Sequence, residues 1–275
     1  MIIWLASYPK SGNTWVRLFL DYLFSSKKEF NINSAHIKQF PLREHFKDLT
    51  TNIENVNELA KYYTIAQDKL NLDNEVKIFK THNALWKLND RYSFTNTRNT
   101  LGTIYIVRDP RNVVTSILNY YRKENYDSAF NFLKNDKVIG GTEDENGMPT
   151  LIASWSNHYN SWKKFKKNYL LVRYEDLLSN PEDEFLKITN FLSSISDFKF
   201  EYQRILKAIN LCEFKNLSKQ EDLNGFKGNP SNNQFLNKKF FNLGPKNKWE
   251  ILLNKDIQSN IEQTFNKEML ELGYL

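Results

Sequence analysis

The sequence predicts an α/β fold in which a central parallel sheet lies between two layers of helices. Four short apolar runs, at residues 2–6, 76–79, 103–107 and 170–173, are rich in β-branched and aromatic side chains and lack the alternation of a half-exposed strand. Helical stretches separate these runs, as expected for parallel strands joined by crossovers. We therefore expect a three-layer α/β/α arrangement, with residues 1–275 forming one domain.

The first apolar run leads into a turn with the properties of an anion cradle. Lys10, Ser11 and Gly12 follow the run, and a helix is expected to begin at about Thr14. Free N–H groups at a helix start, the positive end of the helix dipole and a lysine together suit a phosphate or phosphosulfate group. The turn lacks the G-x-x-x-x-G-K-[ST] spacing of a nucleotide triphosphate P-loop, because here the lysine precedes the glycine.

The other three apolar runs also end in polar residues. The sequence is Lys-Thr-His at 80–82, Arg-Asp-Pro-Arg at 108–111 and Tyr-Glu-Asp at 174–176. Ligands of open α/β sheets bind beyond the carboxyl ends of the strands. We therefore expect all four polar clusters to converge on one crevice.

Capping signals place the helices between these strands. Asp109 is expected to cap a helix with Pro110 at its first position, and Asn180 with Pro181 predicts another. A further helix is expected to begin at Pro149.

This last helix would carry Trp155 and Trp162 on one face, two turns apart, where tryptophans are typical of a buried core. His158 lies between them and is expected to be structural.

Three segments have weak patterning: 27–74, 125–147 and 215–239. Segments of this kind are either specificity loops or plain irregular surface, and the sequence leaves both interpretations open. The third is rich in Lys, Asn and Gly and is expected to form a mobile flap.

Composition narrows the classes of function. The formal net charge of +6 suits a polyanionic ligand, nucleic acid or a membrane surface equally well. Cys212 is the single cysteine, so an internal disulfide is impossible, and we expect it to be a small buried apolar residue. The first apolar run begins at residue 2 and no run approaches membrane-spanning length, which favours a cytoplasmic protein without membrane insertion.

Taken in order, these motifs resemble the sulfotransferases that use 3′-phosphoadenosine 5′-phosphosulfate (PAPS), and the likeness covers nearly the whole chain. Residues 8–15, Tyr-Pro-Lys-Ser-Gly-Asn-Thr-Trp, are similar to the family's Y-P-K-S-G-T-T-W phosphosulfate loop, with Asn13 in place of a threonine. Residues 80–82 resemble its K-T-H strand end. Residues 108–116 resemble its 3′-phosphate motif, and 154–162 and 174–176 match further landmarks. The implied fold is P-loop-like.

The resemblance implies roles for individual residues. His82 would be the catalytic base, Lys10 would meet charge on the leaving group, and Lys80 would lie beside the sulfuryl oxygens. Arg108 and Ser116 would hold the 3′-phosphate. Other donor-binding residues would be Ser11, Gly12, Asn13, Thr14, Trp15, Tyr174, Phe214 and Gly244. PAPS would be the donor and 3′-phosphoadenosine 5′-phosphate (PAP) the product, and the scheme needs no metal.

Near the carboxyl terminus the chain departs from the family pattern. The family commonly shows R-K-G-x-x-G-x-W, whereas residues 242–249 read Asn-Leu-Gly-Pro-Lys-Asn-Lys-Trp. Gly244 and Trp249 keep register, but the basic pair is missing. The candidates to replace it are Lys238, Lys239, Lys246 and Lys248. Alternatively, these lysines form a solvated surface.

Two other functions share part of this pattern. A P-loop kinase for a small hydroxyl compound would share the fold class but would need magnesium ligands. An RNA-binding protein would suit the charge and the many aromatic residues, but its basic and aromatic residues would interleave on an exposed face. We expect a small-molecule or natural-product acceptor with a hydroxyl group, and no nucleic acid. The sequence does not indicate the oligomeric state.

Overall fold

The computed structural model describes residues 1–275 except 26–28, 35, 141–147 and 229–238. The strands are β1 (Ile2–Ser7), β2 (Lys77–Thr81), β3 (Lys87–Leu88), β4 (Tyr92–Ser93), β5 (Thr100–Val107), β6 (Ile139–Gly140), β7 (Thr150–Leu151) and β8 (Tyr169–Arg173). The α-helices are α1 (Asn13–Phe24), α2 (Val56–Ala60), α3 (Tyr63–Leu70), α4 (Pro110–Tyr120), α5 (Tyr126–Lys134), α6 (Trp155–Lys163), α7 (Tyr174–Ser179), α8 (Pro181–Ile195), α9 (Tyr202–Leu211), α10 (Phe214–Asn224), α11 (Trp249–Leu252), α12 (Lys255–Thr264) and α13 (Asn266–Glu271).

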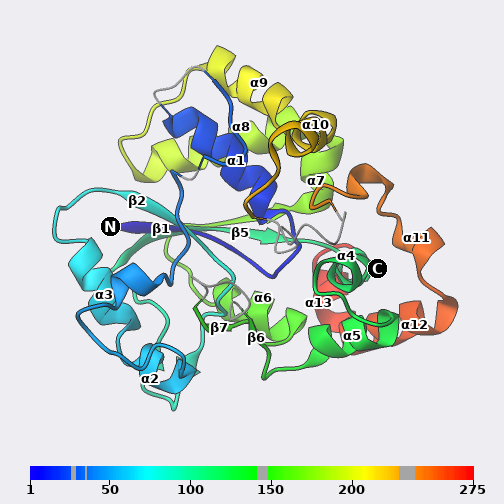
Figure 1. Cartoon of the computed structure of the whole chain (residues 1–275), viewed down its shortest axis with the longest axis horizontal. Coiled ribbons are helices and arrows are strands. Elements are labelled where there is room, and N and C mark those ends of the chain that lie inside the picture. Colours follow the sequence, from blue (N-terminus) through cyan, green and yellow to red (C-terminus); the bar gives the residue numbers. More distant parts are fainter. Residues whose placement is uncertain (26–28, 35, 141–147, 229–238) are drawn as a thin grey trace.

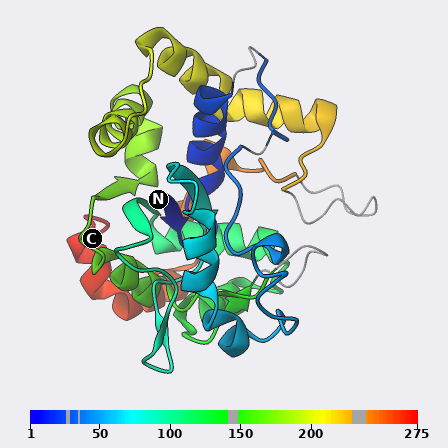
Figure 2. The same ribbon diagram turned by 90° about the vertical axis from the view of Figure 1, so that its left-hand side faces the viewer.

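A four-stranded parallel sheet in the order β2-β1-β5-β8 forms the centre of the molecule. The alternation of β1 sends Ile3 and Leu5 to one face, where they pack with α1, α8 and α9, while Trp4 and Ala6 face the other. Figure 1 shows the two layers of helices on opposite faces of the sheet, and Figure 2 shows the same layers from the side. The predicted three-layer fold with a central parallel sheet is confirmed.

The strand ends differ from the predicted ones by a few residues. The second strand continues through Lys80 and Thr81 rather than stopping at residue 79, so these two side chains belong to the strand. Segment 38–40 pairs with the outer edge of β2: the Lys80 N–H donates to the Lys38 carbonyl at 2.9 Å, and the Phe40 N–H donates to the Lys80 carbonyl at 3.0 Å. This pairing extends the strand and brings Lys80 and His82 to its end.

The helix signals at the two Asx-Pro pairs are confirmed, but the signal at Pro149 is wrong. Asp109 caps α4 by accepting the Arg111 N–H at 2.8 Å. Helix α8 begins at Pro181 with Asn180 at the cap position, but the Asn180 side chain makes no capping hydrogen bond. After Pro149 the chain forms β7, which pairs with β6, and α6 begins only at Trp155. The Ser154 side chain caps α6, so the helix starts where its backbone donors find an acceptor.

The weakly patterned segments contain more structure than expected. Helices α2 and α3 lie within 27–74, and their side chains Leu59, Tyr63 and Ala66 are buried against the sheet. Helix α5 lies within 125–147, and α10 occupies residues 215–224 of the expected flap. Residues 141–147 and 229–238 of these segments lie outside the described part. Trp155, Trp162 and Cys212 are buried, as predicted.

Candidate active site

The carboxyl ends of all four central strands border one cavity of about 780 Å³. Lys10 follows β1, Lys80 and His82 lie at the end of β2, Arg108 follows β5 and Tyr174 follows β8. The structure thus brings the predicted clusters together. The predicted residues that border the cavity are Lys10, Gly12, Asn13, Thr14, Trp15, Lys80, His82, Arg108, Ser116, Tyr174, Phe214 and Gly244.

The turn between β1 and α1 has the backbone of a tight cradle. Lys10 has a φ of 66° and Gly12 a φ of 103°, both in the left-handed region. At Gly12 a Cβ atom would lie 2.5 Å from a ring carbon of Tyr174, so a larger residue would have to displace that ring. Helix α1 begins at the next residue, and the Trp15 N–H already donates to the Gly12 carbonyl at 3.0 Å. The N–H groups before Trp15 are those that a helix start leaves without an intrahelical acceptor. Gly12, Asn13 and Thr14 border the cavity, so this helix start lies at the cavity.

The side chains of Asn13 and Ser11 are both buried in this turn but differ in their hydrogen bonds. Asn13, which replaces a threonine of the family motif, donates from Nδ2 to the Leu5 carbonyl at 3.0 Å and to Ser7 Oγ at 3.2 Å. It therefore ties the start of α1 to β1. Ser11 is fully buried and does not border the cavity, and its Oγ has no hydrogen-bond partner among the described residues.

His82 has a defined tautomer. Its Nδ1 lies 2.8 Å from the Ser7 carbonyl oxygen, which can only accept, so Nδ1 carries the proton and Nε2 carries the lone pair. Burial lowers the pKa of His82 to about 3, and the nearby charge of Lys80 acts in the same direction. The imidazole is therefore neutral at pH 7.

His158 supports His82 through the backbone. Its Nε2 donates to the His82 carbonyl at 3.2 Å, while its Nδ1 accepts from the Tyr105 hydroxyl at 2.8 Å. Both His158 and Tyr105 are buried. The structural role expected for His158 is thus the fixing of the chain at the end of β2.

Lys10 extends between two aromatic rings. Its Nζ lies 4.0 Å from the ring centroid of Tyr120 and 4.0 Å from that of Phe240. Burial lowers the pKa of Lys10 to about 7, and the positive charges of Arg108 and Lys80 lower it further than Glu221 raises it. Lys10 is therefore a cation whose charge depends on pH near neutrality.

Arg108 and Ser116 are neighbours, as their shared predicted role requires. Arg108 Nη1 donates to Ser116 Oγ at 3.2 Å and to the Lys10 carbonyl at 3.1 Å, which links the ends of β5 and β1. The guanidinium carbon lies 4.2 Å from the ring centroid of Tyr174. Its Nε is buried and has no hydrogen-bond partner in the described part of the chain. Asn247 Nδ2 also donates to Ser116 Oγ, at 3.0 Å.

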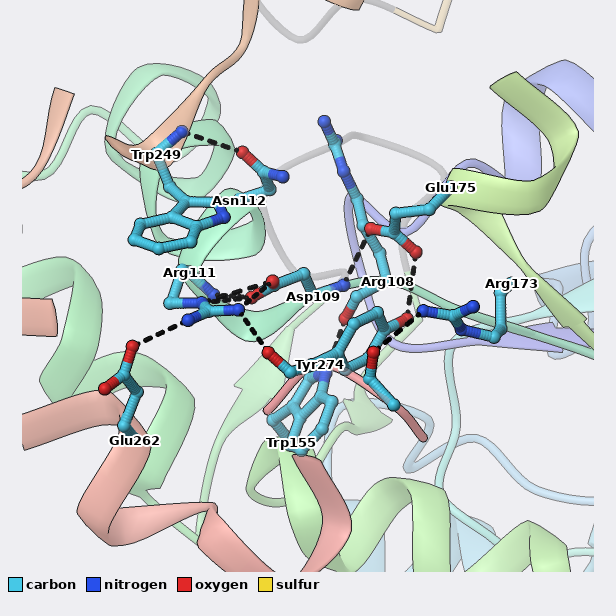
Figure 3. Close-up of polar contacts among 11 residues, drawn as sticks. Arg108, Asp109, Arg111, Asn112, Trp155, Arg173, Glu175, Trp249, Glu262 and Tyr274 are labelled. Atoms are coloured by element: carbon cyan, nitrogen blue, oxygen red, sulfur yellow. Dashed lines mark hydrogen bonds and ion pairs between the residues drawn. The ribbon is translucent and has the colours of Figure 1, made fainter. Parts of the chain in front are cut away.

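A polar network fixes the turn that carries Arg108 (Figure 3). Arg111 donates to Asp109 through Nη2 at 2.7 Å, to Glu262 through Nη1 at 2.6 Å and to the Tyr274 carbonyl at 2.7 Å. Glu175 accepts the Asp109 N–H at 3.0 Å and the Tyr274 hydroxyl at 2.9 Å. Residues near the carboxyl terminus thus fix the end of β5 through this network.

The aromatic candidates for adenine, Trp15, Tyr174 and Phe214, all border the cavity. Trp15 and Tyr174 contact edge to face with centroids 5.9 Å apart, and Trp15 Nε1 is buried without a hydrogen-bond partner among the described residues. Phe214 lies against Gly244, whose φ is 51°. A Cβ atom there would lie 2.4 Å from the Phe214 ring. Gly244 therefore allows close packing of the two segments.

The structure shows what occupies the place of the missing basic pair. Asn242 and Leu243 border the cavity directly before Gly244. Among the candidate lysines, Lys239 borders the cavity and pairs with Asp222 at 2.7 Å, whereas Lys246 and Lys248 do not border it. Lys238 lies outside the described residues.

Sequence reasoning missed several residues of this site: Asn247, Tyr120, Phe240 and Glu221. Only the spacing from Arg108 could have indicated Tyr120, which lies one turn beyond Ser116 on α4. Asn247, Phe240 and Glu221 reach the site only through contacts between segments distant in sequence, which no local pattern indicates.

Among the residues that the structure describes, no group of three or more His, Cys, Asp and Glu side chains is placed to hold a metal ion. None of the helices in that part of the chain has both the length and the apolar character needed to cross a membrane.

Comparison with known proteins identifies relatives of this chain. The family model described as "Sulfotransferase domain" matches residues 2–273. Cytosolic sulfotransferase 5 of Arabidopsis thaliana is 22% identical over 98% of this chain and 80% of its own length. Sulfotransferase 1 family member D1 of Mus musculus is 27% identical over 69% of this chain and 58% of its own length.

Solved structures share the fold. A mouse sulfotransferase, SULT7A1, complexed with PAP, superposes with a TM-score of 0.61 at 19% identity, covering 98% of this chain and 84% of the other. A retinol dehydratase in complex with androsterone and PAP gives a TM-score of 0.57 at 18% identity, covering 98% and 80%.

Proposed function

The chain belongs to the sulfotransferase family, and from this premise we propose how its residues transfer a sulfuryl group from PAPS to an acceptor hydroxyl. The donor supplies the sulfuryl group and a phosphate as leaving group. The observation that carries the proposal is the convergence of three cationic side chains, Lys10, Lys80 and Arg108, on one cavity beside the amino terminus of α1. Such a site suits a ligand with several negative charges.

The buried donors of the site fit an adenosine carrier with two phosphates. Trp15 Nε1 and Arg108 Nε, on two side chains that border the cavity, are buried without a partner among the described residues, and a buried donor left unpaired costs about 1–3 kcal/mol. We propose that Lys10 and the residues from Ser11 to Thr14 hold the 5′-phosphosulfate. Arg108 and Ser116 then hold the 3′-phosphate, with Asn247 supporting Ser116.

The aromatic residues of the cavity provide surfaces for the base. We propose that adenine lies among Trp15, Tyr174 and Phe214, with Gly244 leaving room beside Phe214. Aromatic faces stack on a base without regard to its identity.

His82 has the geometry of a general base. Its Nε2 carries the lone pair, and its Nδ1 is held by the Ser7 carbonyl. We propose that Nε2 takes the proton of the acceptor hydroxyl as the oxygen forms its bond to sulfur. The bond from sulfur to the phosphate oxygen breaks, its electron pair goes to that oxygen, and Lys10 meets the developing charge. Lys80 stabilises the sulfuryl oxygens.

The cavity lining not assigned to the donor has both apolar and polar side chains, as suits a small molecule with a hydroxyl group. Ile152 and Tyr121 border the cavity, as do Gln39 and Thr150. We propose a small-molecule or natural-product alcohol or phenol as acceptor. The relatives named as cytosolic enzymes support a cytoplasmic location. The shared central sheet supports one catalytic domain over residues 1–275.

An acceptor panel assayed with PAPS labelled on sulfur tests this function. In the presence of a metal chelator, we expect label to pass to at least one phenol or alcohol, with PAP released in equal amount. PAP release without labelled product would contradict transfer to an acceptor.

The charge of Lys10 predicts a pH dependence of donor binding. Because the pKa of Lys10 is lowered to about 7, its ammonium is present below that pH and is lost as the pH rises above it. A bound polyanion favours the charged form, so binding of PAP at pH 8 should take up a proton. Calorimetry in two buffers of different ionisation enthalpy measures this uptake.

Lys10→Arg is the matched control, because a guanidinium keeps its charge over this range. We expect proton uptake in the wild type and almost none in Lys10→Arg. Equal uptake in both proteins would assign the proton to another group.

A further inference from the structure

The carboxylate of Glu221 holds a chain segment that comes from outside its own helix. Glu221 lies near the end of α10 and is 8% exposed. Its Oε1 accepts the N–H of Phe240 at 2.7 Å and its Oε2 accepts the N–H of Phe241 at 2.8 Å. One carboxylate therefore fixes two successive peptide groups with charge-assisted hydrogen bonds.

This contact determines where the Phe240 ring lies. Phe226 packs against the ring with centroids 4.8 Å apart, and Tyr120 meets it edge to face at 6.0 Å. Lys10 Nζ lies 4.0 Å from the centroids of both Phe240 and Tyr120. The ammonium is thus held between a ring of α4 and a ring whose backbone Glu221 anchors.

Holding the ammonium between two rings is useful for a lysine that must stabilise the negative charge developing on the leaving group. A lysine has a flexible four-carbon stem and loses rotamer freedom when its ammonium is fixed. Two aromatic faces attract the ammonium and limit its movement.

We propose that Glu221 is a positioning residue for sulfuryl transfer, acting through Phe240 to hold the Lys10 ammonium where the leaving group develops its charge. This inference rests on the proposed function. It gives Glu221, Phe240 and Tyr120 roles for which the sequence motifs provide no indication. Glu221 itself touches neither the donor nor the acceptor in this scheme.

A double-mutant cycle tests the proposal in the full chain. The steady-state rate with labelled PAPS is measured for the wild type, Glu221→Ala, Phe240→Leu and the double variant. Because small displacements of a reacting group have large effects, we expect each single change to lower kcat roughly tenfold. If Glu221 acts through Phe240, the double variant should be no slower than Phe240→Leu alone. Multiplied losses, or a wild-type kcat in Glu221→Ala, would overturn the proposal.

A pH profile separates positioning from simple stabilisation. The groups that set the charge of Lys10 are Arg108, Lys80 and Glu221, and among these Glu221 alone raises its pKa. In Glu221→Gln, which keeps the size of the side chain, we expect kcat to be lowered at every pH, including pH 6, where the Lys10 ammonium is charged in both proteins. A wild-type kcat at pH 6, with only the fall above neutral pH moved to lower pH, would show a direct charge effect on Lys10 and would overturn the proposal.

Lys219→Gln is the matched control. Lys219 lies two residues before Glu221 on α10, is exposed and does not border the cavity. This variant should keep both kcat and the pH profile of the wild type. Circular dichroism at the assay temperature establishes that each variant is folded, and wild-type turnover in the same assay tests the proposed function separately.

Discussion

His82→Ala should abolish turnover while leaving the affinity for PAP nearly intact. The imidazole is neutral at pH 7, and its Nδ1 donates to the Ser7 carbonyl. Its Nε2 is therefore unprotonated and can accept a proton. Removal of a general base typically lowers the rate about 10²–10⁴-fold. Single-turnover transfer of labelled sulfuryl measures the loss, and calorimetry with PAP measures the affinity.

His36→Ala is the control for this experiment, because His36 is exposed and does not border the cavity. It should retain the wild-type rate. If His82→Ala keeps most of its activity, another group takes the proton and the assignment of the base is wrong.

Arg108→Ala should weaken donor binding by about 3 kcal/mol, roughly a hundredfold in Kd, because hydrogen bonds to charged groups are the strong ones. Arg108 is 7% exposed and lies beside Ser116, with its Nε lacking a partner among the described residues. The loss should be large for PAP and small for adenosine 5′-phosphate, which lacks the 3′-phosphate. Equilibrium titration of both ligands measures the difference.

Two variants sharpen this result. Arg108→Lys keeps the charge but not the fork of donors, so its affinity for PAP should lie between those of the wild type and Arg108→Ala. Arg98→Ala removes an exposed arginine that pairs with Asp68 and should change neither affinity. Equal losses for the two ligands in Arg108→Ala would contradict the assignment of the 3′-phosphate site.

The sequence predicted the sheet well because its signals are local. Runs such as 103–107 are continuous and apolar since the strand is covered on both faces, and the polar residues that follow mark the strand end. The helix starts at Pro110 and Pro181 are likewise set by neighbouring residues. The anion-binding turn before α1 could be predicted for the same reason, because its residues are consecutive in the sequence.

The errors arose where distant segments decide the local structure. Pro149 was expected to start a helix, but the next residues pair with β6, and no local pattern reveals that partner. Lys80 became part of β2 because segment 38–40 pairs with it. The contact of Asn247 with Ser116 spans 131 residues, and the contact of Glu221 with Phe240 depends on a return of the chain after α10.

The most direct test of the central claim compares two nucleotides by calorimetry in the presence of a metal chelator. A site built from the Lys10 turn and Arg108 should bind PAP tightly and ATP negligibly, since ATP lacks the 3′-phosphate that we propose Arg108 and Ser116 hold. Tight binding of ATP that requires magnesium, with weak binding of PAP, would contradict the account and favour a kinase.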